Sequence, residues 1–441
     1  MQKFTQETTQ NKKAILKLDV NYLLFSAYLF GIVLFSRNFA HLEFNISGIP
    51  LYTTEFVIMV MLFILFKQGR IFRKLKFKLD PVTKWLFVLY VIAAISLFRG
   101  LIAYNDKVFV LRQSAIIYYS IFYFLTPIII NSEKKINFLF NCLFLAALLI
   151  VLNSMINFNS VIGAYKYYYL GLAIIMEIIY IILVKTKYKK LLLLVVFLQL
   201  IYFILEQVRA SWVGMGGVLF FAIVLIRSYL KSKFLINRII VYCLIGIMGS
   251  TCLLWVIKPK LINSVYSEVL SIILLNTDDN LGKGSVVSAR WRLFVWKDII
   301  EESLEKPILG WGFGNKFIPK TIKKLDWGGS WKDDSKGFQD PHNSFLSILH
   351  RTGFAGLSVF IILVIAFIKR SIGMIRYIND NKMKAYYVGL LLCVIFVLGN
   401  SFFAVVLEGP FMGIFLWICM GLMISLERIN RKLSDINTNK Y

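Results

Sequence analysis

The chain has 441 residues, 58% of them hydrophobic, and a formal net charge of +26 at pH 7. Apolar stretches of about 16 to 25 residues recur from end to end, and each is long enough to cross the hydrocarbon core of a bilayer. This pattern excludes a soluble globular protein, and because the basic residues fall between the apolar stretches, it also argues against a nucleic-acid-binding protein.

Hydropathy predicts an all-α, polytopic membrane protein of about twelve transmembrane helices. The first apolar run follows a lysine-bearing leader, but it has no small-residue cleavage site, so it is interpreted as a span and not as a signal peptide. In chain order the expected spans are 21–36, 52–66, 85–98, 108–130, 136–156, 161–184, 191–206, 210–226, 239–257, 343–368, 385–404 and 410–426.

The connections between these spans differ in their content of basic residues. Of the 50 Lys and Arg residues, 30 fall on the side that holds both termini, and 13 of the others fall in one long polar segment, 258–341. The positive-inside rule therefore predicts cytoplasmic termini and an extracytoplasmic segment 258–341. We expect three parts: residues 1–257 with nine spans, 258–341 as one large, partly helical loop, and 342–441 with the last three spans and a cytoplasmic tail.

Arg209 lies in a very short external turn between the seventh and eighth expected spans. A cation at this place is costly without a partner. Glu206 could pair with it, or the side chain could reach the interface. Alternatively, the guanidinium group could hold an anionic part of a substrate, since its planar fork donates hydrogen bonds in pairs and keeps its charge.

An amphipathic helix is predicted over Trp291–Lys306 of the long loop, ended by Pro307. Arg290 and Arg292 are expected at its beginning, where free amide groups also favour an anion. Two arginines beside tryptophans are, however, also typical of a solvated face that lies along a membrane. The apolar residues that recur at helical spacing are Val295, Trp296, Ile299, Ile300 and Leu304.

Glycines and tryptophans follow the predicted loop helix. Gly310-Trp-Gly-Phe-Gly314 comes after a helix and not after a strand, so a dinucleotide-binding fingerprint is excluded. We interpret the run as a tight turn that lets the backbone approach the membrane surface. Trp311, Trp327 and Trp331 are either interface anchors or stacking platforms for sugar rings.

The long loop meets the tenth span at Phe338-Gln-Asp-Pro-His-Asn-Ser-Phe-Leu346. Asp340 is expected to cap the helix, Pro341 to take its first position, and His342 to lie in its first turn. Helix amide groups there disfavour an imidazolium, so a neutral His342 could serve as a base. The alternative is a capped membrane helix with an incidental histidine.

The apolar runs also contain a few ionisable side chains and five cysteines. Glu177 in the sixth span and Glu55 near the start of the second are intramembrane candidates, and Glu177 could mark a proton path or pair with a polar neighbour. His350 is expected to pack or to partner a neighbouring polar group, and His41 is unassigned. The cysteines have no paired spacing typical of metal or disulfide frameworks, so they are interpreted as packing residues: Cys142, Cys243, Cys252, Cys393 and Cys419.

Three motifs stand in a fixed order along the chain: Val208-Arg-Ala-Ser-Trp212, then the Trp291–Trp296 helix with Pro307–Gly314, then Asp340–Leu346 with Arg351–Gly356. Together they resemble the O-antigen ligase and polymerase family of bacterial membrane glycosyltransferases. The motifs cover about residues 205–365, and the arrangement of spans extends the similarity to the whole chain.

The resemblance implies a metal-independent transfer of a glycan from undecaprenyl diphosphate to an acceptor hydroxyl, on the outer face of the bacterial cytoplasmic membrane. It implies that His342 activates the acceptor and that Arg209 and Arg292 bind the donor diphosphate, with Arg290 as a helper. Neither a cofactor nor a metal is expected. The implied partners are a lipid-linked oligosaccharide, a glycan or lipid-glycan acceptor, the bilayer and other polysaccharide assembly proteins.

Two other classes of function stay open. Many spans with internal charges would also suit a transporter or flippase of lipid-linked glycans. Against this, the chain has no obvious repeated halves, and its candidate charges gather on one side. A scaffolding role is the third possibility, and the set of two arginines and one histidine argues against it. The sequence does not separate a polymerase of repeat units from a ligase of a finished glycan.

Overall fold

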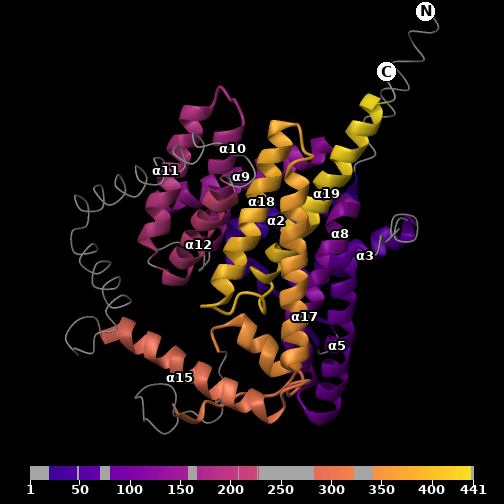
Figure 1. Ribbon diagram of the computed structural model, residues 1–441, viewed down its shortest axis with the longest axis vertical. Helices are drawn as coiled ribbons and strands as arrows, with labels where there is room; N and C mark the ends of the chain where they lie inside the picture. The colour runs from indigo at the N-terminus through magenta and orange to yellow at the C-terminus, as the bar shows by residue number, and fades with distance from the viewer. Residues whose placement is uncertain are drawn as a thin grey trace, which may run out of the picture.

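The computed structural model describes residues 19–46, 49–69, 80–156, 166–206, 208–225, 227, 283–321 and 341–438, which form a helical bundle with one helix lying across its end (Figure 1). The ninth expected span, 239–257, lies outside the described residues, and helices occupy the other eleven. Seven of the described helical stretches have at least 18 residues and the hydropathy of a membrane span. The all-α membrane fold is therefore confirmed.

The first half of the bundle contains α2 (Val20–Ala40), α3 (Thr53–Lys67), α5 (Pro81–Ala103), α9 (Glu133–Ile156), α10 (Lys166–Leu183), α11 (Lys189–Leu205) and α12 (Arg209–Leu225). The fourth expected span is divided into α6 (Lys107–Gln113), α7 (Ala115–Tyr118), the 3-10 turn η1 (Tyr119–Ile121) and α8 (Phe122–Ile129). The loop helix α15 (Lys283–Glu305) precedes α17 (Ser344–Ile375), α18 (Asn381–Ser401) and α19 (Gly413–Thr438).

A small hairpin follows α2, and the sequence analysis did not predict it. Its strands β1 (Glu43–Ile46) and β2 (Ile49–Tyr52) are antiparallel, with Glu43 opposite Tyr52. Arg112 of α6 holds the hairpin, because its guanidinium group lies 2.7 Å from the Glu43 carboxylate and 4.6 Å from the centre of the Tyr52 ring.

The centre of the bundle is α18, which packs against α10, α12, α17 and α19. Glycines bring α12 and α18 close together, since a Cβ atom on Gly399 would lie 3.1 Å from the Cα atom of Gly214. Small residues at a helix crossing let the backbones of membrane helices approach one another. The position of α12, which begins at Arg209, is thereby fixed by α18.

α17 is broken at Gly353, where φ is 67° and ψ is −171°. A Cβ atom at this glycine would lie 2.3 Å from the carbonyl oxygen of Ile308, so a side chain does not fit there. The loop segment after α15 crosses the break and uses backbone groups that a continuous helix would pair internally. Four hydrogen bonds join the two: Trp311 N–H to His350 O (2.8 Å), Gly312 N–H to Arg351 O (3.0 Å), Phe354 N–H to Pro307 O (2.7 Å) and Ala355 N–H to Ile308 O (3.2 Å).

The Gly310–Gly314 run forms the expected tight turn, but it packs against helices and not against a membrane surface. The Arg99 guanidinium group on α5 donates to the carbonyl oxygens of Leu309 (3.1 Å) and Gly310 (3.0 Å). The three glycines of the run all have positive φ, at 62°, 86° and 99°. Backbone-to-backbone packing of this kind needs glycine, which explains the composition of the run.

The far end of α17 carries a group of charged side chains, of which Glu427 is buried and Arg370 and Asp80 are half-buried. Arg370 pairs with Asp80, the N-cap of α5, and lies 2.6 Å from the Glu427 carboxylate of α19. The Tyr387 hydroxyl of α18 donates to the same carboxylate at 2.8 Å. Four helices are therefore joined at this end by charged and polar side chains.

Candidate functional site

α17 begins later than the sequence predicted. Its N-cap is Asn343, whose side-chain oxygen accepts hydrogen bonds from the backbone N–H groups of Phe345 (3.0 Å) and Leu346 (3.1 Å). His342 therefore precedes the helix and does not lie in its first turn. The cause is its left-handed backbone, with φ of 49°, which prevents the helix from continuing back to Pro341. Asp340, the expected cap, lies outside the described residues.

Two tryptophans of α15 hold this turn. The indole N–H of Trp296 donates to the carbonyl oxygen of Pro341 at 2.7 Å. The ring of Trp291 meets the ring of His342 edge to face, with 5.3 Å between the centroids and 78° between the planes. A left-handed residue other than glycine costs roughly 1–2 kcal/mol, and these contacts offset that cost. Strained backbone conformations of this kind are common at functional sites, so the turn at His342 is the first candidate for the functional site.

Arg292 follows Trp291 on α15, beside the tryptophan that contacts His342. α15 begins at Lys283, earlier than expected, because the residues up to Arg290 contain a single glycine and no proline to end a helix. Arg290 and Arg292 are consequently inside the helix and not at its beginning, which corrects the prediction. Free amide groups of a helix start are absent there, so the guanidinium group of Arg292 would hold an anion by itself. The side chain of Arg290 lies outside the described part.

The turn between α11 and α12 places Arg209 as expected, at the first position of α12. Its side chain is not among those described. The Ser211 hydroxyl, two residues later and buried, donates to Asn400 Oδ1 on α18 at 3.0 Å. Glu206, the alternative partner for Arg209, accepts a hydrogen bond from the Tyr202 hydroxyl.

The end of α18 contacts both the beginning of α12 and the loop helix α15. Phe403, just beyond α18, lies with its ring 6.2 Å from the ring of Trp296 on α15. The beginnings of α12 and α17 and the helix α15 thus lie at the same end of the bundle (Figure 1). His342 and the α15 backbone at Arg292 are brought together, whereas the convergence of the Arg209 side chain on them stays a prediction.

Glu408, in the connection between α18 and α19, is a residue that the sequence analysis missed. Its carboxylate accepts a hydrogen bond from the Ser344 hydroxyl at 2.5 Å. The Ser344 oxygen in turn accepts from the backbone N–H groups of Val406 (3.2 Å) and Leu407 (3.1 Å). A signal was present: Glu408 is an isolated charge in a short connection between apolar runs, as Arg209 is.

His350 partners a polar neighbour, as expected. Its Nε2 lies 3.1 Å from the Glu302 carboxylate of α15, and Asn315 Nδ2 donates to the same oxygen at 3.1 Å. The Trp311 indole donates to the Glu302 carbonyl oxygen at 2.9 Å, and the Lys306 ammonium group covers its ring at 3.8 Å. Trp311 therefore joins the loop to α15, while Trp327 and Trp331 lie outside the described residues.

Tyr104, at the end of α5, adds a hydrogen bond from its hydroxyl group to the Trp311 carbonyl oxygen at 3.4 Å. Burial raises the pKa of this phenol, and the nearby Arg99 guanidinium partly lowers it. The phenol consequently stays protonated and remains a donor.

The two intramembrane carboxylates have polar neighbours. Glu177 accepts from the Gln199 amide at 3.1 Å, and Glu55 accepts from the hydroxyl groups of Tyr118 (2.6 Å) and Tyr119 (2.7 Å). Of the two interpretations of Glu177, its contact with Gln199 favours polar pairing over a proton path. Within the described ranges, no group of three or more His, Cys, Asp or Glu side chains could hold a metal ion.

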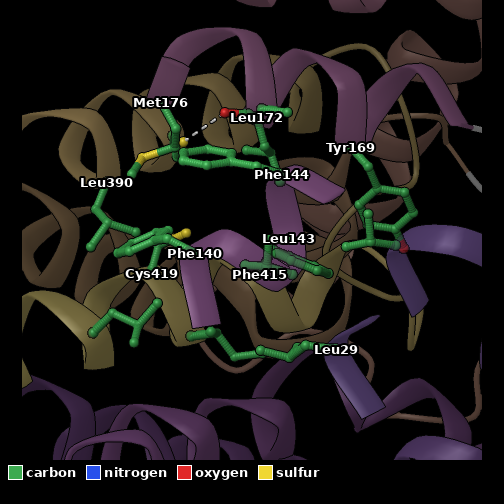
Figure 2. A pocket seen from close by; sticks show the side chains of 15 residues that line it. Leu29, Phe140, Leu143, Phe144, Tyr169, Leu172, Met176, Leu390, Phe415 and Cys419 are labelled. Carbon is green, nitrogen blue, oxygen red and sulfur yellow. Dashed lines mark hydrogen bonds between the residues drawn. The ribbon is translucent and has the colours of Figure 1, made fainter. Parts of the chain in front are cut away.

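A small apolar cavity of about 50 Å³ lies between α2, α9, α10, α18 and α19 (Figure 2). Tyr169 is at one side of it, and its hydroxyl donates to the Phe411 carbonyl oxygen at 2.7 Å. The described lining contains no charged side chain, and neither Arg292 nor His342 contributes to it. Its chemistry suits hydrocarbon and does not suit a diphosphate. Cys393 and Cys419 line it, in agreement with a packing role.

Comparison with known proteins matches residues 194–361 to the family described as O-antigen ligase. This range contains Arg209, Arg292 and His342. A protein of Rickettsia typhi named as a putative polysaccharide ligase is 34% identical over 84 residues, which are 19% of this chain and 20% of that protein. One of Rickettsia conorii with the same description is 32% identical over 101 residues, 22% of this chain and 23% of that protein. The matches thus span about a fifth of each relative, and the family resemblance inferred from the motifs is confirmed.

Proposed function

Residues 194–361 of this multi-pass membrane protein belong to the O-antigen ligase family, and on that premise we propose that it transfers a glycan from undecaprenyl diphosphate to an acceptor hydroxyl. The acceptor oxygen forms a bond to the anomeric carbon, and the bond from that carbon to the diphosphate oxygen breaks. The carrier diphosphate leaves with the electron pair, and the acceptor proton passes to His342.

The turn at His342 is the observation that carries this proposal. Its imidazole is held at a strained position by Trp291 and by the Trp296 hydrogen bond to Pro341. A general base must be fixed within reach of the proton that it accepts, and such a base typically contributes about 10²–10⁴-fold to the rate. A histidine that served only to start a membrane helix would not need this support.

Arg292 and Arg209 bind the diphosphate in this mechanism, with Arg290 as a helper. Negative charge grows on the leaving group as the anomeric bond breaks, and fixed guanidinium groups stabilise that charge more strongly in the transition state than in the ground state. Two such groups can carry out the neutralisation without a divalent ion, so the transfer is proposed to be metal-independent. Glu408 and Ser344 act as positioning residues, because they fix the beginning of α17.

The proposed transfer takes place on the outer face of the bacterial cytoplasmic membrane, with both termini in the cytoplasm. The distribution of Lys and Arg supports this part of the proposal, since 30 of 50 fall on the side of the termini. The acceptor is a growing polysaccharide in a polymerase or another glycan-bearing molecule in a ligase. Other envelope polysaccharide assembly proteins are the proposed partners.

Release of the carrier tests the proposal directly. Protein in nanodiscs would be given lipid-linked oligosaccharide from the organism that encodes the chain, and free undecaprenyl diphosphate would be measured in the presence of a chelator. We expect His342→Ala to lower the rate by about 10²–10⁴-fold. His41→Ala, a histidine outside the proposed site, is the matched control and should keep the rate.

Two results would contradict the proposal. One is unchanged turnover in a folded His342→Ala protein, which would remove the general base. The other is movement of labelled donor across a vesicle membrane without release of the carrier, which would favour the transport alternative.

A further inference from the structure

The loop helix α15 has two apolar faces and not the single face that the sequence predicted. Val295 and Ile299 are buried, with 0% and 1% of their surface exposed, and they pack with Trp291 and Phe317. Ile300 and Leu304, which were expected on that same face, are 42% and 57% exposed. The five apolar residues of the predicted face are therefore divided between opposite sides of the helix.

The exposed residues form a stripe along α15. At 3.6 residues per turn, Leu293, Ile300 and Leu304 share one side, opposite Val295 and Ile299. Leu293 is 55% exposed, so none of the three is covered by the described parts of the protein. Lys297 and Glu301 lie beside the stripe, 3.8 Å apart, with exposed side chains.

The stripe is continuous with the surface that the spans present to lipid. Ile308, just beyond α15, is 72% exposed, and its carbonyl oxygen accepts from the backbone N–H of Ala355 in α17. The neighbouring Phe354 is also exposed. Phe98 and Ile102 on α5 are exposed next to the glycine run that follows Ile308. The exposed aliphatic and aromatic side chains of the spans α5 and α17 and those of the loop helix α15 thus form one apolar surface.

From this continuity we infer that α15 is an interfacial helix, whose stripe Leu293, Ile300 and Leu304 is immersed, together with Ile308, among lipid acyl chains. Its charged flank of Lys297 and Glu301 then lies at the level of the lipid headgroups, where both charges stay hydrated. A helix of this kind lies in the plane of the interface with its apolar side buried about 5–10 Å into the headgroup and acyl boundary. The occupant of the stripe is the bilayer itself, and the inference does not depend on the proposed activity.

Fluorescent labels on neighbouring residues of α15 test this inference. Single cysteines would replace Ile300 or Leu304, with Glu301 as the matched control position on the same helix, in a chain whose native cysteines are replaced by alanine. Each cysteine would carry an environment-sensitive dye, and the full-length protein would be placed in phosphatidylcholine vesicles. Lipids with a nitroxide near the headgroup and aqueous iodide are the two quenchers.

We expect blue-shifted emission at 300 and 304 and at least twofold stronger quenching by the nitroxide lipid than at 301, with the opposite order for iodide. Equal iodide quenching at 300, 301 and 304 would overturn the inference, because the stripe would then face water. A label at 300 or 304 that neither quencher reaches would also overturn it, because protein would then cover the stripe. If the cysteine-free chain does not accumulate, the native cysteines are kept and the dye uptake of the unsubstituted protein is subtracted.

Discussion

At its beginning α17 is held by backbone hydrogen bonds, glycine contacts and a left-handed histidine, whereas near its end it is held by charged side chains. From the break at Gly353 to Arg370 the continuous part of the helix extends roughly 25 Å, at 1.5 Å per residue. The first end joins α17 to α15 and to the connection after α18, and the loop segment after α15 joins it to α5. The second end joins it to α5 and α19 through Arg370.

The two kinds of contact respond differently to substitution. Backbone packing around the glycines allows only one arrangement of the loop segment on α17, and this arrangement fixes the position of α15 relative to His342. Buried ion pairs join helices, and breaking one leaves an uncompensated charge inside the protein. Substitutions at the beginning of α17 should therefore change activity more than stability, and substitutions near its end should do the reverse.

The largest expected effect is at His342, where two variants separate chemistry from strain. His342→Ala and His342→Gly both lack the imidazole, so both should lower turnover by about 10²–10⁴-fold. Only glycine adopts the left-handed backbone without cost, so His342→Gly should unfold with a free energy about 1 kcal/mol higher than His342→Ala. Chemical denaturation in detergent would measure the difference. Equal stability of the two variants would mean that the backbone at 342 is not strained.

The sequence was informative wherever a residue's role depends on its local chain. Hydropathy found the spans, Pro307 marked the end of α15, and the turn before α12 was recognised from its length. The left-handed turn at His342 was missed, because Asp340 and Pro341 have the residue types of a helix start and compete with Asn343 for that role. Only the contacts of Trp291 and Trp296, about fifty residues earlier, select the observed arrangement.

Arg370 gives the next largest effect, and it is an effect on stability. Arg370→Met would leave the buried Glu427 and the Asp80 carboxylate without their cation, which should cost about 3–5 kcal/mol. Thermal unfolding in detergent would measure the loss, and the rate per folded molecule should stay within about twofold. Lys369→Met, an exposed neighbour on the same helix, should change the unfolding free energy by less than about 0.5 kcal/mol. If Arg370→Met lowered the rate per folded molecule without lowering stability, the assignment of activity to the beginning of α17 and of stability to its end would be wrong.

Gly353→Ala tests the break in α17. The added methyl group would meet the Ile308 carbonyl oxygen, so the loop segment would have to shift and α15 would move with it. A misplacement of about 1 Å can lower a rate by about 10²-fold, and we expect an effect of that size on carrier release. Gly373→Ala is the matched control, since the new Cβ would meet no atom within 4 Å. Similar rates for the two variants would show that the break does not position the site.

The contact between α15 and α17, which we call the seam, consists of Glu302, Asn315 and His350. It shows why part of the site could not be predicted. Glu302 looks like an ordinary charge on a polar helix face, and Asn315 like a loop residue. Each acquires its role only when the glycine run folds across α17 and places both beside His350. Contacts between residues 35 and 48 positions apart leave no local pattern in a single sequence.

Glu302→Gln should have the smallest of these effects, because the amide oxygen can still accept one hydrogen bond. The loss of charge weakens the contacts to Asn315 and His350, which should lower the unfolding free energy by about 1–2 kcal/mol. Carrier release should fall by less than about tenfold, since the Trp311 hydrogen bond to the Glu302 backbone persists. Glu301→Gln, exposed and one residue away, should leave both quantities unchanged. If the two variants behaved alike, the seam would not contribute to holding α15, and the glycine contacts alone would explain how the beginning of α17 is fixed.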